Sequence, residues 1–388
     1  MRQLGLILSA VLLAACTGGT PTRAPSARPA STTNSSSGAP TILPIFISSE
    51  ILAGKNRFVF SLVDNANTVV AAPDVPVTLE FFDIAKDDAK VAFTANARFL
   101  WAIEGQKGLY VANVEFTRAG RWGVRFDATF PGGRKEQVRA DFTVAASGPT
   151  PALGAKAVSV DTPTAGAVGG DLAKVSTDKK PNPGFYSRSV EDAIAARDPF
   201  VLVFATPAFC QTAICGPMLD TVKAVAAAYP TLTFINVEPY KMAFTDGRLQ
   251  PELAAGQLQA AAWTDAWGLR TEPWVFVVDA GGAVSAKFEA VVAEDELRAA
   301  FQAVVPVSGT ARGIVIAVDQ PSLTEVTSFT LRTAAGETIV FGVGTLDLAN
   351  GGFNAGHLRE HMATATGIVV TFSIAAGQRV ANRLTDAQ

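Results

Sequence analysis

The chain has few of the side chains that carry most enzyme chemistry. Its 388 residues include three cysteines and two histidines, and 32 Lys+Arg against 35 Asp+Glu give a formal net charge of −3. A charge this close to neutrality supplies no basic stripe for phosphates, so we expect no nucleic-acid partner. The sequence also lacks a glycine-rich phosphate loop of the required form, and no Ser/His/Asp set can be drawn with conviction. Three cysteines and two histidines are a small set, so the role of each one has to be accounted for.

Long apolar runs are scarce as well. One run, residues 4–14, follows Arg2 and leads into Leu13-Ala14-Ala15-Cys16. It is too short to span a bilayer as a mature helix, so it predicts a signal peptide. No other segment reaches about 18 consecutive apolar residues, the length that a membrane span needs.

Small residues directly before a cysteine resemble the lipobox of bacterial lipoproteins. The resemblance implies that residues 1–16 are a signal peptide and lipobox and that Cys16 is lipidated. We therefore expect an extracytoplasmic protein anchored to the bacterial cell membrane through Cys16; the alternative is an ordinary secretory signal with a chance cysteine. Residues 17–40 are rich in Ser, Thr, Pro, Gly and Ala and predict a flexible tether. Such a compartment permits disulfides, which bears on the two remaining cysteines.

The first folded segment, residues 41–146, has the pattern of an antiparallel β-sandwich. Phe58, Phe60 and Leu62 alternate with other residues, and similar short runs recur between glycine-rich turns. The stretches Gly108-Leu109-Tyr110-Val111 and Ala119-Gly120-Arg121-Trp122 resemble small immunoglobulin-like domains of extracytoplasmic bacterial proteins. Residues 147–183 are again rich in Gly, Pro, Thr and Ala and predict a linker.

The second folded segment, residues 184–306, predicts an α/β domain. Residues 199–205 form a continuous apolar run, typical of a buried parallel strand, and a helix is predicted over 216–229. The elements predicted next are a strand at 232–237, a helix within 251–267, strands at 274–279 and 283–288, and a helix at 294–304. Strand, helix, strand, hairpin and helix in this order indicate an α/β arrangement.

The third folded segment, residues 309–388, predicts a small β-rich domain. Its expected strands cover 313–318, 328–332, 338–343 and 368–374, with a helix at about 354–362 capped by Asn354. This order fits a small barrel of the oligonucleotide/oligosaccharide-binding type.

The cysteine site lies in the α/β segment, between its first strand and its first helix. Cys210 is followed after four residues by Cys215-Gly216-Pro217-Met218. At a helix N-terminus, Cys215 would meet unpaired backbone N–H groups that favour a thiolate. Pro217 at the start of the helix loses nothing by lacking an N–H. Cys210, across a short loop, is close enough to form a disulfide with Cys215.

These residues resemble the thioredoxin superfamily, whose Cys-Gly-Pro-Cys motif occupies the same strand-to-helix junction. Thr271-Glu272-Pro273-Trp274 matches the place of that family's cis-proline, with Pro273 as the candidate. The resemblance covers about residues 199–304. It implies a thioredoxin-like fold, thiol–disulfide exchange on exported protein thiols, and a substrate groove shaped by Pro273 and Pro217. In this interpretation Cys215 attacks and Cys210 resolves, with no cofactor beyond the protein's own disulfide and with a redox partner.

The sequence departs from that family at several points. Met218 stands where the second cysteine is expected, and the strand before the motif carries no acid among residues 201–204. A non-catalytic binding or scaffold lipoprotein that uses the fold with a structural disulfide is therefore the open alternative. Enzyme activity stays undecided at this point.

The two histidines fall in His357-Leu358-Arg359-Glu360-His361. Histidines four apart on a helix share a face, and the string matches the H-x-x-E-H peptidase motif. That motif belongs to large peptidases with a distant carboxylate ligand, and this segment is a small β-rich one. We expect a solvated helix face here and no metal. Copper delivery by the cysteine pair is disfavoured because no histidine occurs between residues 199 and 304.

Overall fold

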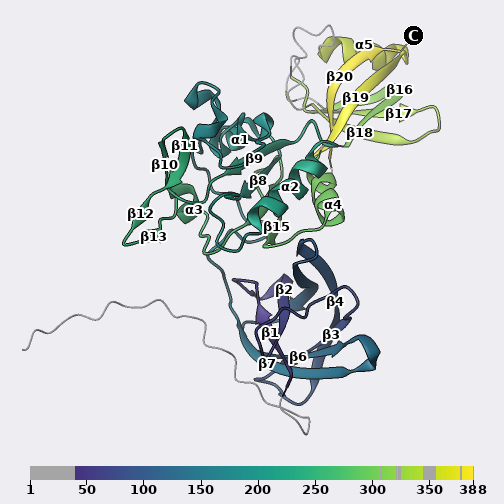
Figure 1. Cartoon of the computed structure of the whole chain (residues 1–388). Coiled ribbons are helices and arrows are strands. Elements are labelled where there is room, and N and C mark those ends of the chain that lie inside the picture. Colours follow the sequence, from purple (N-terminus) through teal and green to yellow (C-terminus); the bar gives the residue numbers. More distant parts are fainter. Residues whose placement is uncertain are drawn as a thin grey trace, which may run out of the picture.

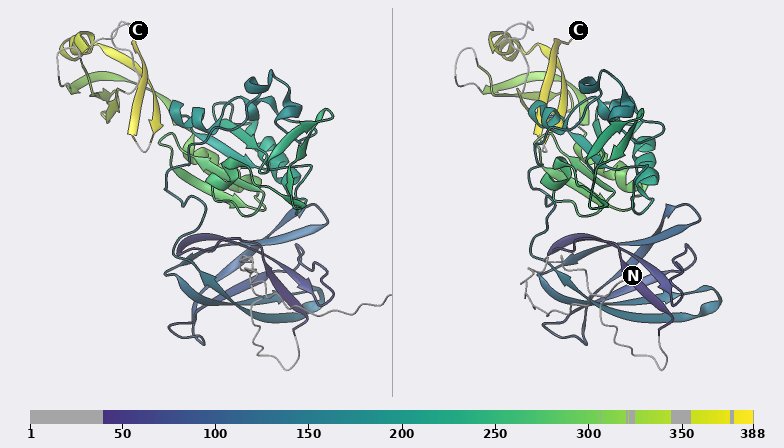
Figure 2. Two further views of the ribbon diagram at one scale, coloured as in Figure 1. Left: turned by 90° about the vertical axis from the view of Figure 1, so that its left-hand side faces the viewer. Right: turned by 60° about the vertical axis from the view of Figure 1, so that its left-hand side comes forward.

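A computed structural model of the chain describes residues 40–305, 307–319, 321, 325–343, 355–375 and 378–387. The predicted signal peptide, Cys16, nearly all of the predicted tether and the proposed cap Asn354 lie outside the described residues. The described chain is arranged in three parts, with an α/β part between an N-terminal β part and a C-terminal barrel (Figure 1; two further views in Figure 2).

The N-terminal part is one antiparallel sheet in the order β1-β2-β5-β4-β3-β6-β7. Its strands are β1 (Ile42–Phe46), β2 (Gly54–Asp64), β3 (Val77–Asp83), β4 (Val91–Ile103), β5 (Lys107–Phe116), β6 (Gly120–Thr129) and β7 (Lys135–Val144), with the 3₁₀ turn η1 (Pro131–Gly133) before β7. The sequence predicted a sandwich, and the structure differs in that the long strand β4 belongs to both halves. Residues 91–97 of β4 pair with β3, and residues 98–103 pair with β5. The sheet thereby folds over a core rich in aromatic rings, among them Phe58, Phe60, Phe81 and Phe126.

The segment 147–183, predicted as a linker, instead lies along the α/β part. It contains the 3₁₀ helices η2 (Gly166–Val168) and η3 (Leu172–Lys174), and η4 (Pro183–Tyr186) follows at its end. Val284 N donates to Ala155 O at 2.9 Å, and Val158 and Val160 pack against the α/β core. These apolar side chains and backbone hydrogen bonds are the reason that the segment is ordered despite its composition.

The α/β part is built on a four-stranded sheet in the order β15-β14-β8-β9. Its helices and remaining strands are α1 (Val190–Ala196), β8 (Phe200–Phe204), α2 (Cys215–Ala226), β9 (Thr233–Val237), β10 (Met242–Thr245), β11 (Arg248–Pro251), β12 (Leu253–Ala254), β13 (Gln257–Leu258), α3 (Ala262–Ala266), β14 (Trp274–Val278), β15 (Val284–Glu289) and α4 (Glu294–Val304). Strand β8 pairs parallel to β9 and antiparallel to β14. The helix predicted within 251–267 is short, because the small β12–β13 hairpin occupies the first part of that segment.

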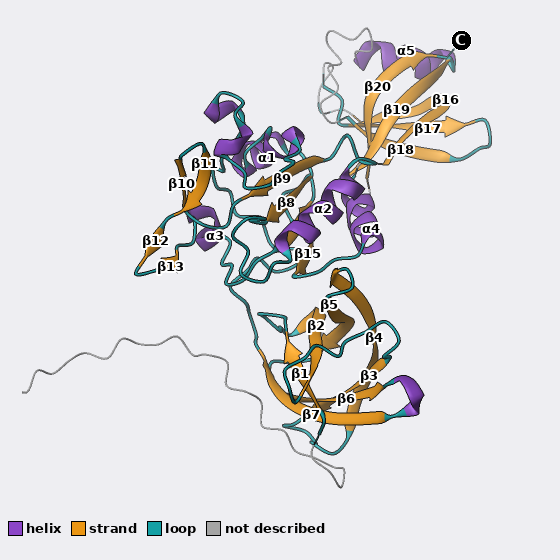
Figure 3. Cartoon of the chain, viewed as in Figure 1, coloured by secondary structure: helices purple, strands orange, loops and turns teal. Residues whose placement is uncertain are grey.

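Both faces of this sheet are buried, which is why β8 and β14 are continuous apolar runs. Val201, Val203 and Val275 point into a cluster with residues of α2 and α4. Phe200 and Leu202 point to the opposite face, where residues of α1 and Trp267 cover them. The sheet is therefore a fixed platform, and the loop that leads to α2 starts from the C-terminal end of its inner strand β8 (Figure 3).

The C-terminal part is a closed barrel in the order β16-β17-β18-β20-β19. Its elements are β16 (Val307–Asp319), β17 (Ser328–Thr333), β18 (Thr338–Gly342), α5 (Ala355–Thr364), β19 (Gly367–Ala375) and β20 (Gln378–Asp386). Phe329, Leu331 and Phe341 fill its interior, and Leu358 of α5 packs against the same cluster.

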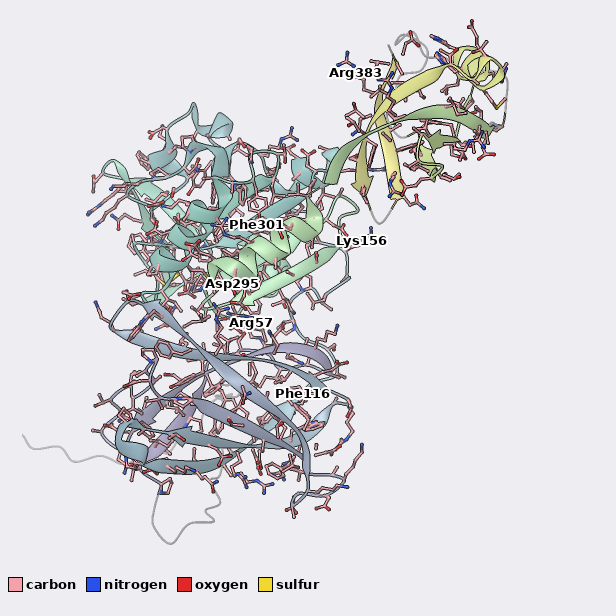
Figure 4. The ribbon with its side chains drawn as sticks, turned by 90° about the vertical axis from the view of Figure 1, so that its right-hand side faces the viewer. Arg57, Phe116, Lys156, Asp295, Phe301 and Arg383 are labelled. Atoms are coloured by element: carbon pink, nitrogen blue, oxygen red, sulfur yellow. A yellow bond between two sulfur atoms is a disulfide. The ribbon has the colours of Figure 1, made fainter. Side chains whose placement is uncertain are left out.

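The β part and the α/β part meet at a junction that contains a hollow of about 570 Å³, lined by Arg57, Glu289, Glu296 and neighbouring residues. Figure 4 labels Arg57 on one side of this junction and Asp295 on the other. Arg57 of β2 makes two hydrogen bonds to Glu296 of α4, at 2.8 and 2.9 Å. Beside this pair, the buried carboxylate of Glu289 accepts from Ser49 N at 2.9 Å and from Thr271 Oγ1 at 2.6 Å. Burial raises the pKa of Glu289. Charged groups this enclosed are stable only when their partners stay in place, so the junction favours one arrangement of the two parts.

We predict that Arg57→Ala lowers the free energy of unfolding by about 1.5–3 kcal/mol, because it removes two charged hydrogen bonds from a junction where the Arg57 and Glu296 side chains are 11% and 18% exposed. Arg98→Ala is the matched control. Its ion pair with Asp295 crosses the same junction but is 53% and 66% exposed, so its loss should cost less than about 1 kcal/mol. Denaturant unfolding of both variants checks the prediction, and equal losses would contradict it.

Candidate functional site

The two cysteines of the α/β part are joined in a disulfide. Cys210 and Cys215 have their Cα atoms 5.9 Å apart, and Cys215 is the first residue of α2. The backbone N–H of Cys215 donates to Cys210 Sγ at 3.2 Å. Ala213 closes the intervening loop with a φ of 62°, in the left-handed region that non-glycine residues rarely adopt. The loop therefore holds both sulfurs at the N-terminus of the helix.

The two sulfurs differ in accessibility. The Cys215 residue is 0% exposed, and its side chain is part of the core under α2. Cys210 is half-buried at the edge of the same cluster. The sequence interpretation made Cys215 the attacking residue, and this burial argues against it, because an incoming partner reaches the sulfur of Cys210 first.

An acid that the sequence analysis did not single out lies beside the disulfide. Glu272 places a carboxylate oxygen within 4.8 Å of both sulfurs, and its Oε1 accepts from Gln211 N at 3.0 Å. Gln211 also donates through Nε2 to Tyr240 Oη at 3.1 Å. Burial and the Glu272 carboxylate raise the pKa of Tyr240. The signal for Glu272 in the sequence was its position directly before Pro273.

Cys210, Cys215 and Glu272 are also a group whose ligand atoms are close enough for one metal ion. While the two sulfurs are bonded to each other, neither is a thiolate and neither can serve as a ligand. Metal binding at this place would therefore require prior reduction of the pair.

The two prolines of the expected groove have different positions. Pro273 follows a cis peptide bond, as predicted, and it is buried. Its carbonyl accepts from Ala290 N at 3.0 Å. Pro217 is exposed on the first turn of α2. Neither residue lines a described cavity near the disulfide.

The β part contacts the cysteine loop directly. Lys107 Nζ donates to Thr212 O at 2.7 Å, and Ile214 is buried in a cluster with Val59 and Leu109 of the β part. Ala290, which directly follows β15 and hydrogen-bonds to Pro273, belongs to the same cluster. One side of the loop is therefore covered by the β part, while Cys210 lies on the side that remains accessible.

A buried acid supports the loop from the other side. Glu238, directly after β9, is 4% exposed, and its Oε1 accepts from Thr177 N at 2.6 Å. Thr206, at the start of the cysteine loop, also hydrogen-bonds to this carboxyl, while Glu238 Oε2 has no partner among the described residues. Burial raises the pKa of Glu238 to about 7. The sequence analysis looked for an acid only in residues 201–204, whereas the neighbouring strand supplies one.

The chain shows little similarity to known proteins. No family model and no curated protein matches it. Among solved structures, it is similar to the soluble domain of PmoD from Methylocystis sp. ATCC 49242 (Rockwell), at 17% identity and a TM-score of 0.19; the match covers 29% of this chain and 96% of that chain. A score this low carries no inference about function. Within the described residues, no helix is both long and apolar enough to cross a membrane.

We predict that Glu238→Gln stabilises the protein at alkaline pH but not at acidic pH. Between pH 4.5 and about 7 the folded chain keeps the Glu238 proton that the unfolded chain has lost, so wild-type stability falls as pH rises through this range. The Glu238→Gln variant has no carboxyl group at this position, so its stability does not fall in this way. Its advantage should grow from near zero below pH 4.5 to at most about 3 kcal/mol above pH 7. Melting curves of both proteins at pH 4.5 and 8 test this, and a difference independent of pH would contradict it.

Proposed function

We propose that the protein is an exported, lipid-anchored thiol–disulfide oxidoreductase whose redox centre is the Cys210–Cys215 pair. The observation that carries this proposal is the disulfide at the N-terminus of α2, with one sulfur accessible and the Glu272 carboxylate beside it. Exported protein thiols are the proposed substrates. Cys16 is the proposed membrane attachment, on the strength of the lipobox resemblance alone.

We propose a thioredoxin-like fold for the α/β part. The parallel pairing of β8 with β9, the helix α2 after β8 and the antiparallel addition of β14 and β15 support it. The position of Pro273 before β14 agrees with the same resemblance. For the C-terminal barrel, helix α5 between the third and fourth strands supports the oligonucleotide/oligosaccharide-binding type of fold. The immunoglobulin-like resemblance of the N-terminal part has weaker support, because a single sheet forms it.

The exchange begins at Cys210. A substrate thiolate attacks Cys210 Sγ, a new sulfur–sulfur bond forms, and the bond to Cys215 breaks. Cys215 leaves with the electron pair as a thiolate, at a helix terminus whose unpaired N–H groups stabilise an anion. A second substrate thiolate then attacks the substrate sulfur of the mixed disulfide and releases Cys210. The substrate dithiol is oxidised to a disulfide, the pair is reduced by two electrons, and a redox partner restores it.

A hollow that Phe209, the residue before Cys210, helps to line is suited to a substrate segment. It has a volume of about 370 Å³ and is lined by Thr177, Ala208, Phe209, Leu249 and neighbouring residues. Phe209 directly precedes Cys210, so a polypeptide bound in this hollow would bring its own cysteine to the disulfide. Arg248 on the rim offers a charge for acidic substrates.

A second function is favoured by the packing of Ile214 and Lys107. A loop fixed between two domains is also what a structural disulfide requires, and the protein would then be a binding or scaffold lipoprotein. The two functions differ in how easily the disulfide is reduced.

We predict a reduction potential of roughly −120 to −270 mV for the Cys210–Cys215 pair, the range of known exchange proteins. The full chain is equilibrated with thiol redox buffers, and the Cys210→Ser/Cys215→Ser double variant provides the blank. In a second assay with a dithiol-containing substrate protein, Cys210→Ser should abolish oxidation of the substrate. A potential below about −300 mV would mark a structural bridge and would replace the enzyme by the scaffold function.

We predict that Glu272→Gln raises the reduction potential of the pair by about 30 mV, a tenfold change in the equilibrium constant. The carboxylate repels a thiolate within 4.8 Å, so its removal stabilises the reduced form. Glu191→Gln is the matched control, because Glu191 is exposed on α1, which covers the opposite face of the sheet. An unchanged potential in Glu272→Gln, or an equal shift in the control, would contradict the role of Glu272.

A further inference from the structure

The two histidines of the chain meet at one end of the C-terminal barrel. His357 and His361 lie on the same face of α5, with ring centroids 4.7 Å apart. Asp386 is the last residue of β20, and it pairs with Ile368 at the start of β19. Because α5 leads directly into β19, this pairing brings Asp386 to the histidines from a distant part of the sequence.

Three ligand atoms converge there. His361 Nε2 is 3.0 Å from His357 Nε2 and 2.9 Å from Asp386 Oδ1, and His357 Nε2 is 3.7 Å from the same oxygen. Two ligands of one tetrahedral zinc ion are separated by about 3.3 Å, given metal–nitrogen distances of about 2.0–2.1 Å. The three separations bracket this value.

The hydrogen bond of Nδ1 determines which ring nitrogen of neutral His361 carries the proton. His361 Nδ1 is 3.1 Å from Thr366 O, and a carbonyl oxygen can only accept, so Nδ1 carries a proton. In neutral imidazole the lone pair is then on Nε2, where it faces a carboxylate oxygen at 2.9 Å. Two such acceptors approach this closely only with a positive species between them, either a proton or a metal ion.

We propose that His357, His361 and Asp386 bind a divalent transition-metal ion. Two imidazoles and one carboxylate suit zinc, copper, nickel, cobalt or iron, whereas calcium and magnesium prefer oxygen ligands. Thr366 O orients His361 in the manner of outer-shell partners at metal sites. His361 is 4% exposed, so the solvated helix face expected from the sequence is wrong for this residue. Glu360, the acid of the H-x-x-E-H string, is exposed, and the third ligand comes from β20 instead.

The test uses the full chain, purified in detergent without reductant, so that Cys210 and Cys215 stay bonded. The chain is stripped with a chelator and titrated with Zn²⁺ in competition with a chromogenic chelator. We expect one Zn²⁺ per chain, and binding weakened more than about 10-fold in His357→Ala and in Asp386→Asn, since loss of outer-shell partners alone costs about 10- to 100-fold. Glu360→Gln, an exposed change on the same helix, should bind as the wild type does.

Folding and binding are separated by the choice of variants. Asp386 is 62% exposed, so its replacement should leave the circular dichroism spectrum and the unliganded melting temperature unchanged. Co²⁺ provides a second readout, because its visible absorption reports nitrogen and oxygen ligation and should be lost in both variants. Absence of Zn²⁺ and Co²⁺ binding in the wild type would overturn the proposal and assign a shared proton to the cluster. Equal binding in wild type and both variants would also overturn it.

Discussion

The junction between the β part and the α/β part is the constraint on which the Cys210–Cys215 disulfide site depends. Arg57 and Glu289 have their charged groups enclosed there, and each is satisfied only by partners across or beside the junction. An enclosed charge that loses its partner is costly, so the two parts are held in one orientation. That orientation places Ile214 against the β part and leaves Cys210 on the accessible side. The chemistry available to the disulfide is therefore decided partly by a domain that contains no cysteine.

Local sequence patterns predicted the regular elements well. Strand β8 is apolar on both faces and follows the rule for a doubly covered strand, and α4 begins and ends at the predicted residues. The helix after the cysteines and the closeness of Cys210 to Cys215 could also be predicted, because each is set by neighbours in the chain. The cis bond before Pro273 was predicted from the resemblance to the thioredoxin superfamily. The continuous sheet of the β part could not, since the length of β4 alone does not show that it pairs with two partners.

The supporting acids show why the sites were harder to predict. Glu272, Glu238 and Asp386 look like ordinary surface acids in the sequence, and each acquires its surroundings from pairing between distant strands. The same holds for the segment 147–183, whose composition indicates a linker but whose valines find an apolar surface on the α/β part. Composition indicates whether a segment is ordered in isolation, whereas tertiary contacts can offset the entropy that the segment loses on ordering.

The contact of Ile214 and Lys107 with the cysteine loop has a thermodynamic consequence. Opening of the disulfide and separation of the two parts are linked equilibria. If the disulfide-bonded loop stabilises the junction by some free energy, the intact junction stabilises the disulfide by the same amount. A ligand of the β part that altered the junction would then change the electron affinity of the cysteines without touching them. In the other direction, reduction of the disulfide would change the free energy with which the β part binds the α/β part.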